Sequence, residues 1–264
     1  MTVSQRAITM EGRKAKCWIG GSGQPLVLVQ GGLGDARQHW APSFDALSEH
    51  FQIIAPDLPG FGVSDPLPMP NYQNYLSWLQ LLFDMLNIGG PVGMMGHSFG
   101  AVLSRLFAAE NTGYVSRLVL VDGGAIADTP GFIRPVFRLP GVGRTIFNLS
   151  HKQPYSYSGL KQVLYDEKMI TPAFIANAQA AALGSETAMR QIATTTPPTL
   201  RTPTCSTLVL WGEHAQLSPV ADGRKVAAEI NGAHFTVIKK AAHMPQIEQP
   251  VDFHAEVLPF LSGK

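Results

Sequence analysis

The sequence contains very little cysteine. Its 264 residues include two cysteines, Cys17 and Cys205, which are far apart and belong to no metal-binding or redox motif. A disulfide framework and a cysteine metal site are therefore not expected. Free thiols are typical of the reducing cytoplasm, and we predict a cytoplasmic location.

Charge of one sign and long apolar runs are also scarce. The net charge is +1, and no basic run of the kind that binds phosphate backbones is present, so we expect no nucleic-acid partner. No apolar stretch reaches the length of a membrane span. The polar residues 1–16 lack the apolar core of a signal peptide, and we expect no membrane partner.

What the sequence does contain is an ordinary globular balance, with 45% apolar and 15% charged residues. The most informative motif is Gly-His-Ser-Phe-Gly at 96–100, which fits G-x-S-x-G. An apolar run at 92–95 precedes it, and a helical pattern follows, so the motif has the strand–turn–helix context of a nucleophile elbow. The turn would strain Ser98 and expose its Oγ, and the Phe99 amide at the helix start could bind an oxyanion.

Other segments alternate between strand and helix. Strands are predicted at 15–19, 26–30, 52–55, 117–122, 207–211 and 235–238, and helices at 38–50, 74–86 and 251–261. The G-x-G at residues 21–23 lacks a helix after it, which favours a hairpin turn over a dinucleotide site. His243 lies on the loop after the last predicted strand, where the general base of a Ser-His-acid triad belongs.

Together these segments resemble the α/β-hydrolase fold family, in particular its small capped esterases, lactonases and C–C hydrolases. The resemblance implies a mostly parallel eight-stranded sheet with helices on both faces and an inserted helical cap. Gln30-Gly31-Gly32 stands where relatives carry His-Gly-x, which makes the Gly32 amide a second oxyanion candidate; a plain glycine turn is the alternative. The loop from Asp57 resembles D-x-P-G-x-G-x-S, with Asp57 structural.

The predicted core comprises residues 1–125 and 202–264, and the predicted cap comprises residues 126–201. In the cap the strand–helix alternation stops, and prolines and aromatic residues crowd the chain. Helical stretches are expected at 159–166 and 172–183. The cap carries a net charge of +4 against −3 for the rest, led by Arg134, Arg138 and Arg144. Either a carboxylate-bearing substrate or a solvated basic face would explain this bias.

One position departs from the family pattern. In W-G-x-x-D-x-x-x-P the aspartate column falls on Ala215, whose methyl group cannot orient His243. Ala215 could be a substitution that vacates the acid position of an ordinary hydrolase. Alternatively the acid is Asp122, at the end of the neighbouring strand about 4.8 Å away, or the chain performs non-hydrolytic chemistry. Glu213 is a weaker acid candidate.

The resulting hypothesis is a serine hydrolase that cleaves an ester or lactone of a fairly apolar small molecule. Ser98 would be the nucleophile and His243 the base, with the oxyanion bound by Gly32 and Phe99. No metal or cofactor is implied. The alternatives are a C–C bond hydrolase of a meta-cleavage-type diketone acid, or a ligand receptor, lyase or cyclase on the same fold. The elbow sequence Ser98-Phe99-Gly100-Ala101 differs from the Ser-Met-Gly-Gly more common in C–C hydrolases.

Overall fold

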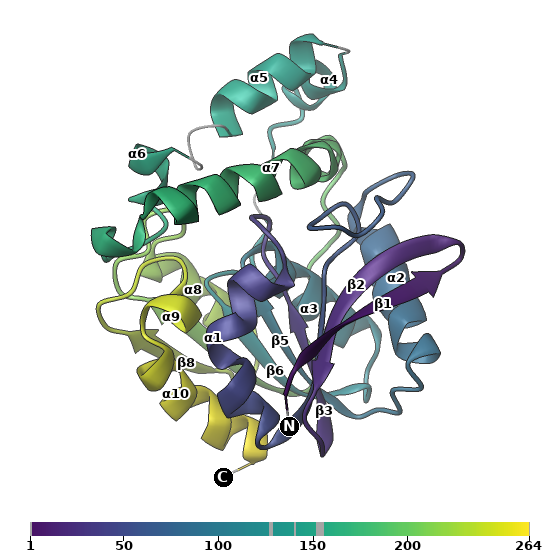
Figure 1. Cartoon of the computed structure of the whole chain (residues 1–264), viewed down its shortest axis with the longest axis vertical. Coiled ribbons are helices and arrows are strands. Elements are labelled where there is room, and N and C mark those ends of the chain that lie inside the picture. Colours follow the sequence, from purple (N-terminus) through teal and green to yellow (C-terminus); the bar gives the residue numbers. More distant parts are fainter. Residues whose placement is uncertain (1, 127–128, 140, 152–155, 264) are drawn as a thin grey trace.

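The computed structural model describes residues 2–126, 129–139, 141–151 and 156–263. They contain one eight-stranded sheet with the order β1-β2-β4-β3-β5-β6-β7-β8. The strands are β1 Ser4–Met10, β2 Arg13–Gly20, β3 Gln24–Val29, β4 Phe51–Pro56, β5 Val92–His97, β6 Val115–Val121, β7 Ser206–Gly212 and β8 His234–Ile238. Within this order, every pair of neighbouring strands from β4 through β3, β5, β6 and β7 to β8 is parallel. Strand β2 pairs antiparallel with both β1 and β4. The predicted mostly parallel sheet is confirmed (Figure 1).

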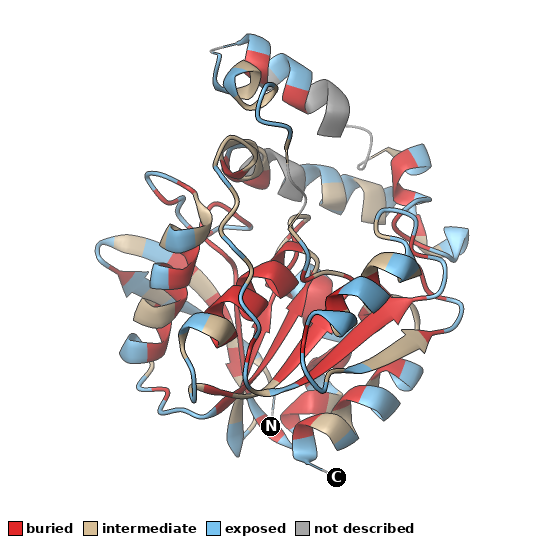
Figure 2. Ribbon diagram, turned by 180° about the vertical axis from the view of Figure 1, so that it is seen from behind, coloured by how far each residue is buried: buried red, intermediate tan, exposed pale blue. Residues whose placement is uncertain are grey.

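Helices cover both faces of this sheet. One face packs against α2 (Tyr72–Met85), α3 (Phe99–Glu110) and α8 (Val220–Ala228) in a core cluster that includes Leu82, Leu103 and Val226. The other face packs against α1 (Ala36–Ser48) and α10 (Pro250–Ser262) through Trp40 and Phe253. Because the central strands are buried on both faces, they are near-continuous apolar runs, and Figure 2 shows them buried.

The predicted hairpin at residues 20–23 is wrong. Strands β2 and β3 are not neighbours, because β4 lies between them. The hairpin instead joins β2 to β1, a strand that sequence reasoning missed because its side chains are mostly exposed and polar. Its two turn residues, Glu11 and Gly12, both have positive φ (48° and 77°), as a type I′ turn requires.

In the described part of the chain between β6 and β7, every regular element is a helix, and these helices lie above the sheet (Figure 1). They are α4 Arg134–Arg138, α5 Val142–His151, α6 Tyr157–Leu160, the short 3₁₀ helix η2 Glu167–Met169, and α7 Pro172–Ala193. The helix expected at 159–166 is wrong, because α6 already ends at Leu160. The one expected at 172–183 continues to Ala193, because Ser185, Ala188 and Ile192 still bury one face. No described helix is both long and apolar enough to cross a bilayer.

Candidate active site

The Gly-His-Ser-Phe-Gly motif forms a sharp turn between β5 and α3. Ser98 has φ 52° and ψ −116°, a strained conformation for a residue other than glycine. A Cβ on Gly96 would lie 2.3 Å from the Gly100 carbonyl oxygen, and a Cβ on Gly100 would lie 2.2 Å from that of Gln30. Both glycines are therefore required by close backbone packing. The Ser98 hydroxyl does not cap α3, which leaves Oγ available for chemistry.

The loop after β3 lies beside this turn. A Cβ built on Gly31 would lie 3.2 Å from Cβ of Ser98, so the two backbones are adjacent. Gln30, which stands where relatives carry His, is fully buried and donates from Nε2 to the Gly34 carbonyl at 3.0 Å, which closes the loop. Among the described residues, the N–H groups of Gly32 and Phe99 donate no hydrogen bond. Both oxyanion candidates are thus free to receive a ligand.

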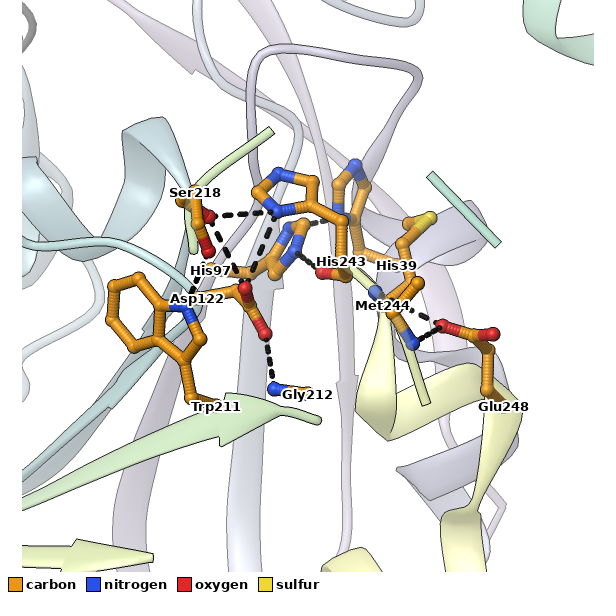
Figure 3. A network of polar contacts seen from close by, with 10 residues as sticks. His39, His97, Asp122, Trp211, Gly212, Ser218, His243, Met244 and Glu248 are labelled. Carbon is orange, nitrogen blue, oxygen red and sulfur yellow. Dashed lines mark hydrogen bonds and ion pairs between the residues drawn. The ribbon is translucent and has the colours of Figure 1, made fainter. Parts of the chain in front are cut away.

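Asp122 and His243 meet at the ends of β6 and β8. Nδ1 of His243 lies 3.5 Å from Oδ1 of Asp122, and both side chains are buried (Figure 3). The Gly212 N–H donates to Oδ2 of Asp122 at 2.7 Å. Burial raises the pKa of the Asp122 carboxyl, and the hydrogen bonds from His243 and Gly212 oppose that rise. A carboxylate held in this way can orient the imidazole and stabilise its protonated form.

Ser218 joins this pair and was missed by sequence reasoning. Its Oγ lies 3.2 Å from Oδ1 of Asp122 and 3.4 Å from Nδ1 of His243. The indole N–H of Trp211 donates to the Ser218 carbonyl at 2.6 Å, which fixes the residue (Figure 3). The available signal was its place just before the proline of W-G-x-x-D-x-x-x-P, on the same loop as the vacated acid position.

Ala215 has a different environment from the one the family pattern suggests. It is buried in the apolar cluster that contains Trp211 and Val226. Glu213, the weaker acid candidate, pairs with His214 at 3.3 Å and accepts the Lys240 N–H at 3.2 Å. The carboxylate beside His243 is therefore that of Asp122, on the strand next to the one that usually provides it.

Two further histidines connect the loops of the site. His97 Nε2 lies 2.6 Å from the His243 carbonyl oxygen, His39 Nε2 contacts the Leu33 carbonyl oxygen, and the two Nδ1 atoms are 3.0 Å apart. Burial lowers the pKa of His39 to about 4 and holds that of His97 well below its ordinary value. Their contacts link the loops after β3, β5 and β8.

Comparison with known proteins places the chain in a family. Residues 26–257 match the family described as "Alpha/beta hydrolase family". The chain belongs to this family. The fold, the elbow and the order in which Ser98, Asp122 and His243 occur along the chain all agree with this membership.

Relatives of this α/β hydrolase include several named hydrolases. An (E)-2-((N-methylformamido)methylene)succinate hydrolase of Acinetobacter baylyi is 31% identical over 112 residues, 42% of either chain. A 2-hydroxy-6-oxo-6-(2'-aminophenyl)hexa-2,4-dienoic acid hydrolase of Metapseudomonas resinovorans is 24% identical over 98% of this chain and 91% of its own. The structure resembles a thermophilic esterase of Thermogutta terrifontis, with a TM-score of 0.81 at 23% identity over 98% of each chain, which shows the shared fold. The sequence comparisons support a hydrolase.

Proposed function

We propose that this α/β hydrolase is a serine hydrolase that cleaves an ester or lactone of a fairly apolar small molecule. The observation that carries the proposal is the contact between His243 and the buried Asp122 carboxylate, beside an elbow that exposes the Ser98 hydroxyl. The nucleophile and the acid then follow the adjacent strands β5 and β6, and the base follows β8, which β7 separates from β6. All three lie at the carboxyl ends of parallel strands, where open α/β sheets bind their ligands.

The reaction has two halves. Ser98 Oγ attacks the carbonyl carbon while His243 Nε2 takes the hydroxyl proton, and the Gly32 and Phe99 N–H groups bind the oxyanion that forms. When the tetrahedral intermediate collapses, the C–O bond breaks and His243 returns the proton to the leaving alcohol. Water then attacks the acyl-enzyme while His243 accepts its proton. The bond between Ser98 Oγ and the acyl carbon breaks, His243 returns the proton to Oγ, and the carboxylic acid leaves. Asp122 holds the ring and stabilises the imidazolium.

The preference for an apolar substrate rests on the cap segment, residues 126–201. A Cβ on Gly32 would lie 3.3 Å from Sδ and Cε of Met189, so α7 directly covers the oxyanion loop. A cavity of about 550 Å³ lies next to this loop, between α1 and the cap, and does not itself reach Ser98 or His243. Its lining combines apolar residues such as Leu160 and Phe174 with the polar side chains of Asp35, Arg37 and Gln38. A cavity of this size suits a small molecule.

A fluorophosphonate tests the proposal at its first step. Incubation should add one phosphonyl group to the protein, and peptide mass analysis should locate it on Ser98. Hydrolysis of p-nitrophenyl esters should then be lost in proportion to labelling. Absence of both labelling and turnover would favour a ligand receptor or a non-hydrolytic catalyst on this fold.

A C–C bond hydrolase of a meta-cleavage-type diketone acid is the second candidate, and the Metapseudomonas relative favours it. The cap arginines give it less support than their charge suggested. Arg134 donates to the Thr129 carbonyl and Arg138 to the Thr194 carbonyl, each at 2.8 Å, so both hold cap segments together. The side chain of Arg144 lies outside the described residues. Parallel assays with a diketone acid and an ester of similar size separate the two activities.

Ser218→Ala is expected to lower kcat/KM about tenfold, because the buried Asp122 carboxylate loses one donor. Loss of a donor to the ionised form raises the pKa of Asp122, so the low-pH limb of the kcat/KM profile should move to higher pH. Ser218→Thr keeps the hydroxyl and serves as the matched control. A profile that is the same for the alanine and threonine variants would remove Ser218 from the mechanism.

A further inference from the structure

The loop that carries His243 is hydrogen-bonded to the cap. The His243 N–H donates to the carbonyl of Val163 at 2.9 Å. The Tyr165 N–H, two residues further along the cap, donates to Oε2 of Glu248 at 2.5 Å. Glu248 ends the short helix α9 (Pro245–Glu248), which directly follows the His243 loop. The cap is thus hydrogen-bonded both to the main chain of the candidate base and to the side chain of Glu248.

The other carboxylate oxygen of Glu248 accepts hydrogen bonds from the loop that carries His243, called the base loop below. Oε1 accepts the N–H of Ala242 at 2.8 Å and that of Met244 at 3.3 Å, the two residues that flank His243 (Figure 3). One mostly buried carboxylate therefore accepts three N–H groups, two from the base loop and one from the cap. Burial raises the pKa of Glu248, while these three N–H groups lower it.

Apolar packing supports the same junction. Met244 belongs to a buried cluster with Leu160, Val163, Leu164 and Ile170 of the cap. The Tyr165 ring stacks on the ring of His214, with centroids 4.5 Å apart and planes 17° apart. Cap residues 160–170 are therefore docked on the two loops that follow β7 and β8.

We propose that Glu248 is a positioning residue that couples the cap to the general base, and this rests on the proposed function. Asp122 orients the ring of His243 through Nδ1, whereas Glu248 sets the place of its backbone relative to residues 163–165. A shift of about 1 Å in a catalytic group can cost on the order of 10²-fold in rate. A change at this junction should therefore lower the rate of the chemical step more than it weakens substrate binding.

Glu248→Gln tests the coupling because glutamine keeps the shape but replaces one oxygen with an NH₂ group, which cannot accept the N–H that faces it. We expect kcat for a p-nitrophenyl ester to fall between about tenfold and a hundredfold, with KM changing less than about threefold, and fluorophosphonate labelling of Ser98 to slow in parallel. The matched control is Glu256→Gln, an exposed glutamate on α10 that accepts only the Thr236 hydroxyl in the described contacts. Glu256→Gln should leave kcat, KM and the rate of fluorophosphonate labelling unchanged.

Amide hydrogen exchange supplies a readout that a local helix-capping role would not move. In Glu248→Gln, amides in the peptide 160–170 should exchange faster than in the parent, whereas a role confined to the His243 loop and α9 would affect only residues 242–248. An unchanged kcat, or unchanged exchange at 160–170, would overturn the coupling. If the glutamine variant does not fold, the same measurements are made on Glu248→Asp, which shifts the carboxylate by one methylene.

The two proposals fail in different ways. If the parent neither turns over esters nor reacts with fluorophosphonate, the serine hydrolase proposal fails, and the exchange measurement still tests the junction. If the parent is active and Glu248→Gln behaves like Glu256→Gln in all assays, the hydrolase proposal stands and Glu248 is not a positioning residue.

Discussion

Ser98→Ala should abolish the turnover of every acyl substrate while the protein stays folded. The hydroxyl is the only proposed atom that bonds to the substrate, and loss of the nucleophile in a serine protease costs on the order of 10⁶-fold in kcat. The fold should survive because the Ser98 hydroxyl caps no helix, and the strained turn is held by the surrounding backbone, with the Ser98 N–H donating to Val121 at 2.9 Å. The measurements are kcat for a p-nitrophenyl ester and the thermal midpoint.

The control for this variant is Ser116→Ala, which removes a hydroxyl near the start of β6, at the end of the strand opposite Asp122. It should retain the parent activity. The informative comparison is with the fluorophosphonate adduct, since Ser98→Ala should also gain no mass. Activity of Ser98→Ala within tenfold of the parent would remove Ser98 from the mechanism.

Asp122→Asn is the second large expected effect. The side chain keeps its size, but it loses the charge that supports the imidazolium, and its NH₂ group can face Nδ1 of His243 and favour the wrong tautomer. The corresponding change in a serine protease lowers kcat about 10⁴-fold. We expect a loss of that order in kcat for a p-nitrophenyl ester, with the folded structure retained because the remaining oxygen, at the Oδ2 position, can still accept the Gly212 N–H.

Ala215→Asp is the companion measurement, since it restores the residue type of the family pattern. We expect little or no gain, because Asp122 already occupies the space beside Nδ1 and position 215 lies in an apolar cluster. The opposite pattern would contradict the assignment of Asp122. A gain of more than about a hundredfold in Ala215→Asp, together with an Asp122→Asn variant that stays active, would make position 215 the native acid site.

Local sequence was sufficient for the elbow and for most elements of the sheet. The requirement for glycine at positions 96 and 100 arises from contacts within a few residues and from one neighbouring strand, so a short motif is enough to indicate it. The strands at 92–97 and 115–121 are apolar runs because they are buried on both faces, and such runs are visible without partners. The strands β2 to β8 were therefore predictable from local pattern, whereas the eight-stranded architecture was implied by the family resemblance, and the roles of Ser98 and His243 remain proposals from that pattern.

Tertiary structure alone decided which groups meet. The sequence left Ala215, Asp122 and Glu213 open as the acid position, and only the parallel pairing of β6 with β7 and β7 with β8 brings Asp122 to His243. Ser218 and Glu248 gained their places in the same way, since their partners are far away along the chain. The hairpin predicted at 20–23 failed because strand pairing depends on which distant strand fills the space between two neighbours in sequence. Hydrogen bonds between residues far apart in the chain leave no periodic signal in the sequence, so they can be identified only from the folded structure.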